Sequence, residues 1–185
     1  LGNVRVALRR SQVEAPSVWR RMVNVLFAYW RIDGPYSEAV DELRQVAATV
    51  DDADRIERAD ALSALGWLTG ARGAFREADE LFSQALALYE AEGRSGRIAD
   101  MHYQLAVSAE LTGNYEEARR HQLARRAIHA EDGDAGRMAR VDHDLGRIAS
   151  FEGDYETAIG LITSSLAQYR TMGDMHSIAI ALYDL

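Results

Sequence analysis

The sequence predicts an all-α fold, a right-handed superhelical solenoid of antiparallel helix hairpins with about four repeats and a partial fifth. Three observations support this prediction. Glycines recur at intervals of 40 residues, apolar residues between them recur at the spacing of one helix face, and only 2 of the 185 residues are proline. A single hairpin cannot bury its own apolar stripe, so each hairpin must stack on the next one.

The glycines form two series that mark the ends of the expected helices. The series are Gly73, Gly113 and Gly153, and Gly93, Gly133 and Gly173. A residue without a Cβ atom can take the left-handed conformation that ends a helix. The first series therefore predicts the turn inside each hairpin, and the second predicts the turn between hairpins.

We expect one domain over residues 1–185, divided by these turns into successive repeats. Its segments are a helical remnant of a preceding hairpin at 1–18, repeats at 19–54, 55–94, 95–134 and 135–174, and a partial repeat at 175–185. In the first repeat the turn is expected at Gly34, with one residue of slippage relative to the 40-residue interval. The chain begins without Met, and we expect it to be part of a longer protein.

The repeat at 55–94 shows how the two helices of a hairpin meet. Leu62, Leu65 and Gly66 lie on one stripe of its first helix, while Phe82 and Ala85 lie on one stripe of its second. A small residue at the contact lets two helices approach closely, and we expect the rings of Phe75, Tyr115 and Tyr155 to fill the space beside the contacts of their repeats. The pattern thus predicts that Gly66 faces the second helix.

These residues resemble the tetratricopeptide repeat family. The resemblance lies in Leu65–Gly66, in Ala78 and Phe82, and in the glycine–x–aromatic turn that begins at Gly73. It implies stacked helical hairpins over nearly the whole chain. The period departs from the usual length of about 34 residues, and the early Trp and closing Pro of that family are missing. Without a Pro at the equivalent place, the second helix can continue to Gly93.

A second resemblance concerns the beginning of the chain followed by a long-period repeat array. It is similar to the repeat region of bacterial STAND-type regulators, which include large LuxR-type and antibiotic-pathway activators. The residues that carry this resemblance are Asn3, Ala7, Leu8, Trp30, Gly34 and Glu38. The resemblance implies a regulatory or sensing module whose ATPase and DNA-binding parts lie outside this chain.

The composition argues against several classes of function. The net charge of −8 repels nucleic acid, and there is no cysteine for disulfides or thiolate metal sites. All 21 basic residues are arginine, which removes the lysine of a P-loop and of Schiff-base chemistry. No apolar run approaches the length of about 18 residues that a membrane span needs. We therefore expect a cytoplasmic protein that contacts neither membrane nor nucleic acid directly.

The expected ligand-binding residues lie on the first helix of each hairpin, on the face that would line the concave surface. They are Asn24, Trp67, Tyr103, His143, Arg147, Phe151 and Tyr183. Aromatic anchors beside arginine are typical of peptide-binding grooves. The alternative is that these side chains pack against neighbouring hairpins, which the sequence favours most for Trp67.

The second helix of the repeat at 95–134 is unusually polar. It has Arg125 and Arg126 where the repeat at 55–94 has Ala85 and Leu86. A buried arginine without a partner would be strongly unfavourable, and the following helix offers Asp142 and Asp144. We predict contacts between the two arginines and the two aspartates. Exposure to water and a pocket for an anionic ligand are the alternatives.

No catalytic residue, metal site or cofactor is predicted. Asp142, His143 and Asp144 are consecutive on a helix and point in different directions, so they cannot converge on a metal ion. The sequence therefore predicts a non-enzymatic module that binds a protein or peptide in its concave groove, as the sensing part of a larger bacterial regulator. Exposed end repeats would also permit oligomerisation.

The leading alternative is a small-molecule effector site in the same groove, and an enzyme or metal protein is the third. An enclosed pocket of roughly 300 Å³ or more around Trp67, Tyr103 and His143 would favour the small ligand.

Overall fold

The computed structural model describes residues 2–33, 36–48 and 55–185, and all regular structure in this part of the chain is α-helical. The predicted all-α class, built from stacked helical hairpins, is confirmed. The turn expected at Gly34 lies outside the described residues. The helices group into two compact units, residues 1–94 and 95–185, and each is described by itself below.

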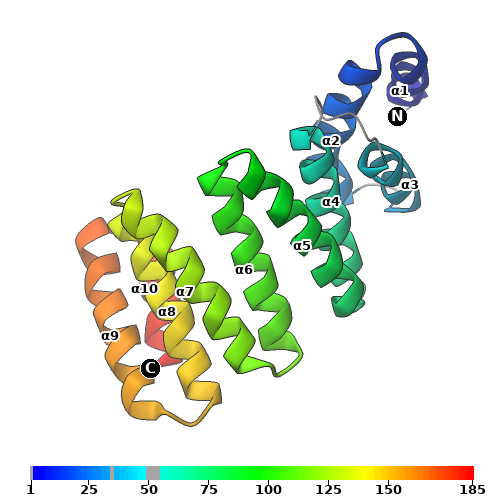
Figure 1. Ribbon diagram of the computed structural model, residues 1–185. Helices are drawn as coiled ribbons and strands as arrows, with labels where there is room; N and C mark the ends of the chain where they lie inside the picture. The colour runs from blue at the N-terminus through cyan, green and yellow to red at the C-terminus, as the bar shows by residue number, and fades with distance from the viewer. Residues whose placement is uncertain (1, 34–35, 49–54) are drawn as a thin grey trace. The chain divides into compact units, whose positions relative to one another are not determined.

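Unit 1 contains two hairpins, α2 with α3 and α4 with α5, preceded by α1 (Figure 1). Its helices are α1 (Gly2–Glu14), α2 (Pro16–Asp33), α3 (Tyr36–Ala47), α4 (Arg55–Gly70) and α5 (Phe75–Ala91). Pro16 opens α2, where the missing N–H of proline costs nothing. Helix α3 packs against both α2 and α4, so the two hairpins share one core.

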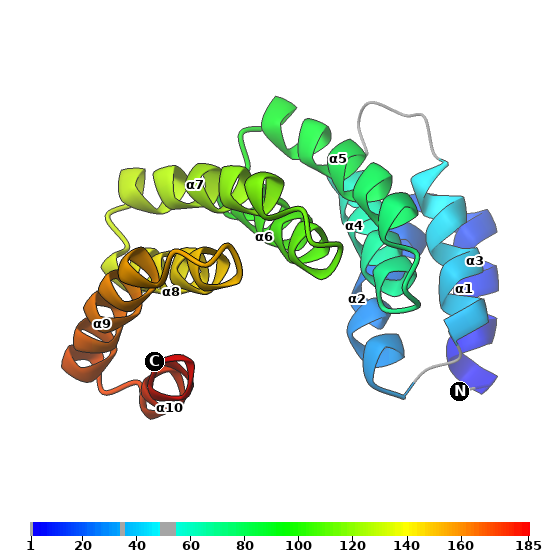
Figure 2. The same ribbon diagram turned by 90° about the horizontal axis from the view of Figure 1, so that it is seen from below.

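Unit 2 contains the hairpins α6 with α7 and α8 with α9, followed by α10. Its helices are α6 (Ser95–Leu111), α7 (Tyr115–Glu131), α8 (Ala135–Phe151), α9 (Tyr155–Met172) and α10 (Met175–Asp184). Helix α7 packs against α8, and α10 packs against α9. Within this unit α7 and α9 lie on one side, and α6, α8 and α10 lie on the other (Figure 2).

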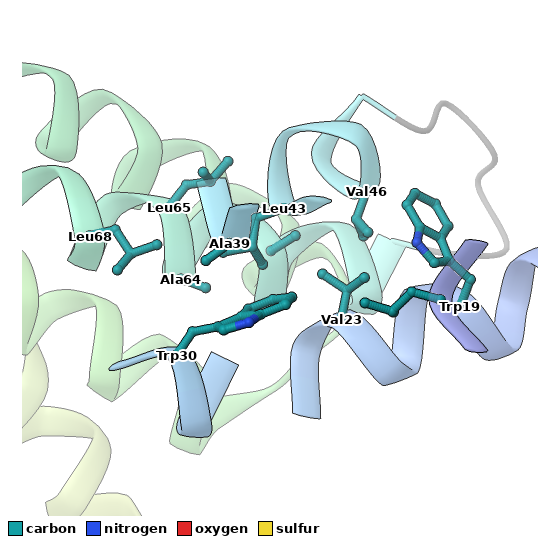
Figure 3. Close-up of a cluster of buried hydrophobic side chains, with 11 residues drawn as sticks. Trp19, Val23, Trp30, Ala39, Leu43, Val46, Ala64, Leu65 and Leu68 are labelled. Carbon is teal, nitrogen blue, oxygen red and sulfur yellow. The ribbon is translucent and has the colours of Figure 1, made fainter. Parts of the chain in front are cut away.

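The core of unit 1 is apolar and is drawn from four helices, α1 to α4 (Figure 3). Trp30 of α2, Leu43 of α3 and Leu68 of α4 are each at most 3% exposed. Trp19, also on α2, is buried and donates its indole N–H to the carboxylate of Glu42 at 2.9 Å, which satisfies the one polar atom of its ring. Side chains of this size, removed from water, supply most of the stability of a stacked hairpin.

Both glycine series end helices as predicted. All six glycines have a positive φ, between 60° and 84°, whereas no other residue type in the described ranges has one. In unit 2 the residue after each turn glycine caps the next helix. Asn114, Asp134, Asp154 and Asp174 each accept a hydrogen bond from the backbone N–H three residues later. The sequence Asp132–Gly133–Asp134 is thus a helix-to-helix turn.

The close helix contact predicted at Gly66 is confirmed and has a counterpart in unit 2. A Cβ atom on Gly66 would lie 2.6 Å from Cε1 of Phe82, and one on Gly146 would lie 2.7 Å from Cγ1 of Ile162. In the hairpin between them the corresponding pair is Ala106 and Gln122. The small residue on the first helix is therefore required by the large side chain on the second.

We predict that Gly146→Ala lowers the free energy of unfolding by about 1–3 kcal/mol, because the added methyl group also meets the backbone oxygen of Ala158 at 3.3 Å, which cannot move aside easily. Gly160→Ala in α9 is the matched control, since nothing lies within 4 Å of its added Cβ. This control should stabilise the protein by about 0.5–1 kcal/mol through helix propensity. Urea unfolding followed by circular dichroism measures both, and two changes of the same sign would contradict the packing described.

Candidate functional site

The candidate site is built on a polar network between α7 and α8 in unit 2. Nη1 of Arg125 lies 3.1 Å from Oδ2 of Asp144 and 3.2 Å from Oε1 of Gln122. Nε of Arg126 lies 2.5 Å from Oδ1 of Asp142. The structure thus brings together the four charged side chains singled out in the sequence, as two neighbouring ion pairs. The alternative that these side chains are simply exposed to water does not hold for Arg125 and Asp144, which are only 14% and 21% exposed.

Burial decides the electrostatics of this network. It raises the pKa of the Asp144 carboxyl, although Arg125, Arg147 and His143 all act to lower it. The attraction to the cations therefore does not fully offset the cost of removing this carboxylate from water. The Arg125–Asp144 pair adds little net stability, but either of its two charges left alone would be strongly unfavourable, so this pair fixes the arrangement of α7 against α8.

The network contacts two partly exposed side chains, Tyr103 of α6 and Arg147 of α8. We call the exposed side chains of α6, α8 and α10 that the sequence assigns to the groove, Tyr103, Arg147 and Tyr183, the inner face of unit 2. The guanidinium carbon of Arg125 lies 4.7 Å from the ring centroid of Tyr103, a cation–π contact. Tyr103 is 40% exposed. Nη2 of Arg147 donates to Oε2 of Glu110 at 2.6 Å, and the Arg147 side chain is 38% exposed. Burial raises the pKa of Glu110, and Arg147 acts against this rise.

The remaining groove candidates of unit 2 differ in accessibility. Tyr183 on α10 is 89% exposed, whereas His143 is only 7% exposed. Nε2 of His143 lies 2.9 Å from Oδ2 of Asp184, and its ring meets Tyr169 edge-on, so it connects α8 to α9 and α10. Tyr103, His143 and Tyr183 are spaced 40 residues apart in the sequence, but only Tyr103 and Tyr183 have exposed side chains. Phe151 is exposed but stacks on Tyr115 at 5.4 Å between ring centroids.

The two candidates in unit 1 take part in packing between α2 and α4. Nδ2 of Asn24 donates to the backbone oxygen of Glu57 at 3.0 Å. The ring of Trp67 lies edge-on to Phe27 at 6.0 Å, with the guanidinium of Arg31 5.6 Å from its centroid, and Trp67 packs against the core of the unit. Trp67 thus takes part in packing, and its role in binding a ligand stays a prediction.

A histidine pair between α6 and α7 was missed by the sequence reasoning. Nδ1 of His102 lies 3.0 Å from Nδ1 of His121, and the ring centroids are 5.3 Å apart. For a fixed N···N distance, the ring centroids are farthest apart when the two nitrogens point at each other, and the observed centroid distance is close to that maximum. The two nitrogens are therefore placed as in a hydrogen bond with one shared proton. The second hairpin has Leu62 and Leu81 at these positions. The signal in the sequence was that one leucine position on each helix of the hairpin is replaced by histidine in the same repeat.

The histidine pair makes the stability of unit 2 sensitive to acid. Burial, followed by the charges of His121 and Arg120, lowers the pKa of His102 to about 4. His102 binds a proton less readily in the folded state than in the unfolded state. The free energy of unfolding is therefore unaffected by this residue above about pH 6.5 and decreases as the pH falls towards 4. The shift corresponds to about 3 kcal/mol before solvent screening, so we expect a loss of about 1–2 kcal/mol.

Urea unfolding of the wild type and of His102→Gln, at about pH 7 and about pH 4.5, measures this loss. His102→Gln should remove most of it, and His176→Gln, an exposed change on α10, should not. Equal pH dependence in all three proteins would contradict the assignment.

Two hollows among the described residues are each confined to one unit, and the residues that line them do not include Tyr103, His143 or Trp67. One of about 410 Å³ lies between α1 and α3, where Arg5 pairs with Glu38. The other, of about 560 Å³, lies between α7 and α9. Across residues 2–33, 36–48 and 55–185, no three His, Asp or Glu side chains are placed to hold a metal ion together. In the same ranges no helix combines the length and apolarity needed to cross a bilayer.

Comparison with known proteins agrees with this architecture. The tetratricopeptide repeat model matches residues 143–175, which span most of α8 and all of α9. The predicted resemblance to tetratricopeptide repeats is confirmed. A search of curated proteins found no match to the sequence.

Solved structures with tetratricopeptide-like folds share the arrangement at low sequence identity. The apo form of RapI matches with a TM-score of 0.84 and 11% identity, over 96% of this chain and 66% of that one. Aspartyl phosphate phosphatase F from Bacillus subtilis matches with a TM-score of 0.80 and 14% identity, over 89% and 44%. A kinesin light chain protein of Podosopora anserina with TPR-like repeats matches with a TM-score of 0.72 and 23% identity, over 93% and 89%. These likenesses establish the fold alone.

Proposed function

We propose that this chain is a non-enzymatic interaction module that binds a protein or peptide segment on the inner face of unit 2. One observation carries the proposal. Tyr103, Arg147 and Tyr183 lie on successive first helices, and the first two contact Arg125 and Glu110, whose side chains are only 14% and 10% exposed. Tyrosine and arginine dominate the energetics of protein interfaces, and side chains fixed beforehand lose less conformational entropy when a partner binds.

An extended peptide fits this face better than a small molecule does. The exposed side chains lie on three parallel helices, and neither described hollow includes them. Peptide main-chain groups can bond with arginine while side chains contact the tyrosine rings. That the same face continues along α2 and α4 of unit 1, as the sequence suggests, stays a prediction.

The biological setting is the second part of the proposal. We infer that the chain serves as the sensing part of a larger bacterial regulator and acts in the cytoplasm, on the basis of the similarity at Asn3, Leu8, Trp30 and Glu38. Reading the complete gene tests this inference. An ATPase or DNA-binding segment in the same polypeptide supports the inference, and a complete gene without either rules it out.

Selection of peptides from a random display library on the immobilised chain tests the binding proposal. Selected peptides are then titrated by fluorescence anisotropy against Tyr183→Ala, Arg147→Gln and Tyr155→Ala. Tyr155, on the first turn of α9, is the matched control because it is 66% exposed but lies outside the inner face.

We expect the first two variants to weaken binding at least about tenfold, which corresponds to about 1.4 kcal/mol, and Tyr155→Ala to change it less than about twofold. Equal losses in all three variants, or peptides that ignore Tyr183 and Arg147, would rule out this face as the binding site.

A further inference from the structure

We propose that the hollow between α7 and α9 is a second binding site, which accepts the apolar face of an amphipathic partner helix with acidic residues along one edge. This hollow, which we call the outer trough, is lined by residues of α7, α8 and α9. Helices α7 and α9 form one side of unit 2, opposite α6, α8 and α10 (Figure 2). The outer trough is therefore separate from the inner face, and the two proposals stand on different residues.

The outer trough is apolar along its floor and walls. Leu145 and Ala149 of α8 form the floor, Leu123 of α7 forms part of one wall, and Leu161 of α9 forms part of the other. Leu123 is an apolar side chain that is nevertheless 51% exposed. Removing these side chains from water would favour binding by about 25 cal/mol for each Å² of apolar surface covered.

The dimensions suit about two turns of a helix. The lining runs from Asp142 to Ala149 on α8, from Arg119 to Arg126 on α7, and from Thr157 to Ser164 on α9. Seven residues of α-helix rise about 10 Å, so the trough is about that long. A partner helix contacts such a trough through residues spaced three and four apart, as in other helix-in-groove complexes.

The charged side chains at the rims of the trough determine which kind of residue the edge of the partner helix should carry. Arg119 and Arg126 line the α7 rim, and their side chains are 47% and 41% exposed. Thr157 and Ser164 line the α9 rim, which is uncharged among the lining residues. Arg119 pairs with Glu152 and Arg126 with Asp142, but a guanidinium has five N–H donors and can bond a further carboxylate. An acidic edge lying along α7 matches this asymmetry.

The origin of the trough is visible in the repeat pattern. Arg126 stands where α5 has Leu86 and α9 has Leu166, and Asp142 stands where α4 has Leu62. The Arg126–Asp142 ion pair therefore occupies positions that are apolar in other repeats, and it lies at one end of the trough. The substitution that the sequence marked as unusual thus bounds an exposed apolar surface.

Two synthetic helices test the proposal. Each is about 16 residues long, carries Leu at helical positions i, i+3, i+4 and i+7, and differs only in having Glu or Lys along one edge. Their binding is measured by fluorescence anisotropy at low and high salt. We expect the Glu helix to bind at least about tenfold more tightly than the Lys helix, with a preference that shrinks as salt is added.

Matched variants locate the binding. Leu123→Asp should weaken binding of the Glu helix at least about tenfold, since it removes apolar surface and repels the acidic edge. Ile159→Asp is the control, because Ile159 on α9 is 55% exposed and does not line the trough. Arg126→Gln should reduce the preference for Glu over Lys.

Equal affinity for the two helices, unchanged binding by Leu123→Asp, or no saturable binding up to about 1 mM would overturn the proposal. Tyr183→Ala, which tests the inner face, should leave binding of the Glu helix unchanged, so a failure at one site is distinguishable from a failure at the other.

Discussion

Replacing Phe82 by alanine is expected to lower the free energy of unfolding of unit 1 by about 3–5 kcal/mol. Phe82 is 3% exposed, and its ring fills the space that Gly66 leaves open between α4 and α5. Alanine removes the ring and leaves a cavity, because the helix backbones cannot close the gap. The loss is a large fraction of the stability of a domain of this size.

Tryptophan fluorescence during urea unfolding measures this loss selectively. All three tryptophans, Trp19, Trp30 and Trp67, lie in unit 1, so the signal reports that unit. Ser83→Ala, an exposed change next to Phe82, is the control and should alter stability by less than about 0.5 kcal/mol. A loss below about 1 kcal/mol for Phe82→Ala would mean that α4 and α5 do not pack in this way.

Replacing Arg125 by methionine should destabilise unit 2 by about 2–4 kcal/mol at neutral pH. The variant leaves the Asp144 carboxylate largely buried with only Gln122 and the more distant cations near it. Burial already raises the pKa of Asp144, and removal of Arg125 should raise it further. The expected cost is that of an uncompensated buried charge, reduced for the solvent that still reaches this side chain.

The pH dependence of this variant identifies the cause. A carboxyl whose pKa is higher in the folded state than in the unfolded state loses stability as the pH rises between those two pKa values. The loss of unfolding free energy caused by Arg125→Met should therefore be smaller at about pH 5 than at about pH 7. Arg126→Met is the control, because the Arg126 side chain is 41% exposed and its loss should cost about 0–1 kcal/mol. An Arg125→Met deficit that is the same at both pH values would contradict the explanation.

The hairpins could be predicted from the sequence because their determinants are local and repeated. A glycine such as Gly113 or Gly153 ends a helix wherever it occurs, and a stripe such as Leu62 and Leu65 indicates a buried face without knowledge of its partner. The ion pairs of Arg125 and Arg126 could be predicted for a similar reason. Arginines at positions that are apolar in the sister repeats require anionic partners if they are buried, and adjacent helices bring Asp142 and Asp144 within reach.

Accessibility at equivalent repeat positions could not be predicted in the same way. The period gives Tyr103, His143 and Tyr183 the same direction on their helices, but exposure depends on what each side chain then meets. His143 meets Tyr169 and Asp184 and is buried, whereas Tyr183 is exposed. The pairing of His102 with His121 was hidden because each residue taken alone looks like a polar substitution.

The central claim is that a buried polar network fixes α7 against α8 and thereby holds the binding side chains of unit 2 in place. A double-mutant cycle between Arg125→Met and Asp144→Asn tests it most directly, with unfolding followed by circular dichroism at about pH 7. We predict a coupling free energy of about 1.5–3 kcal/mol, with the double variant more stable than Arg125→Met alone. A coupling below about 0.5 kcal/mol, with additive losses, would contradict the claim.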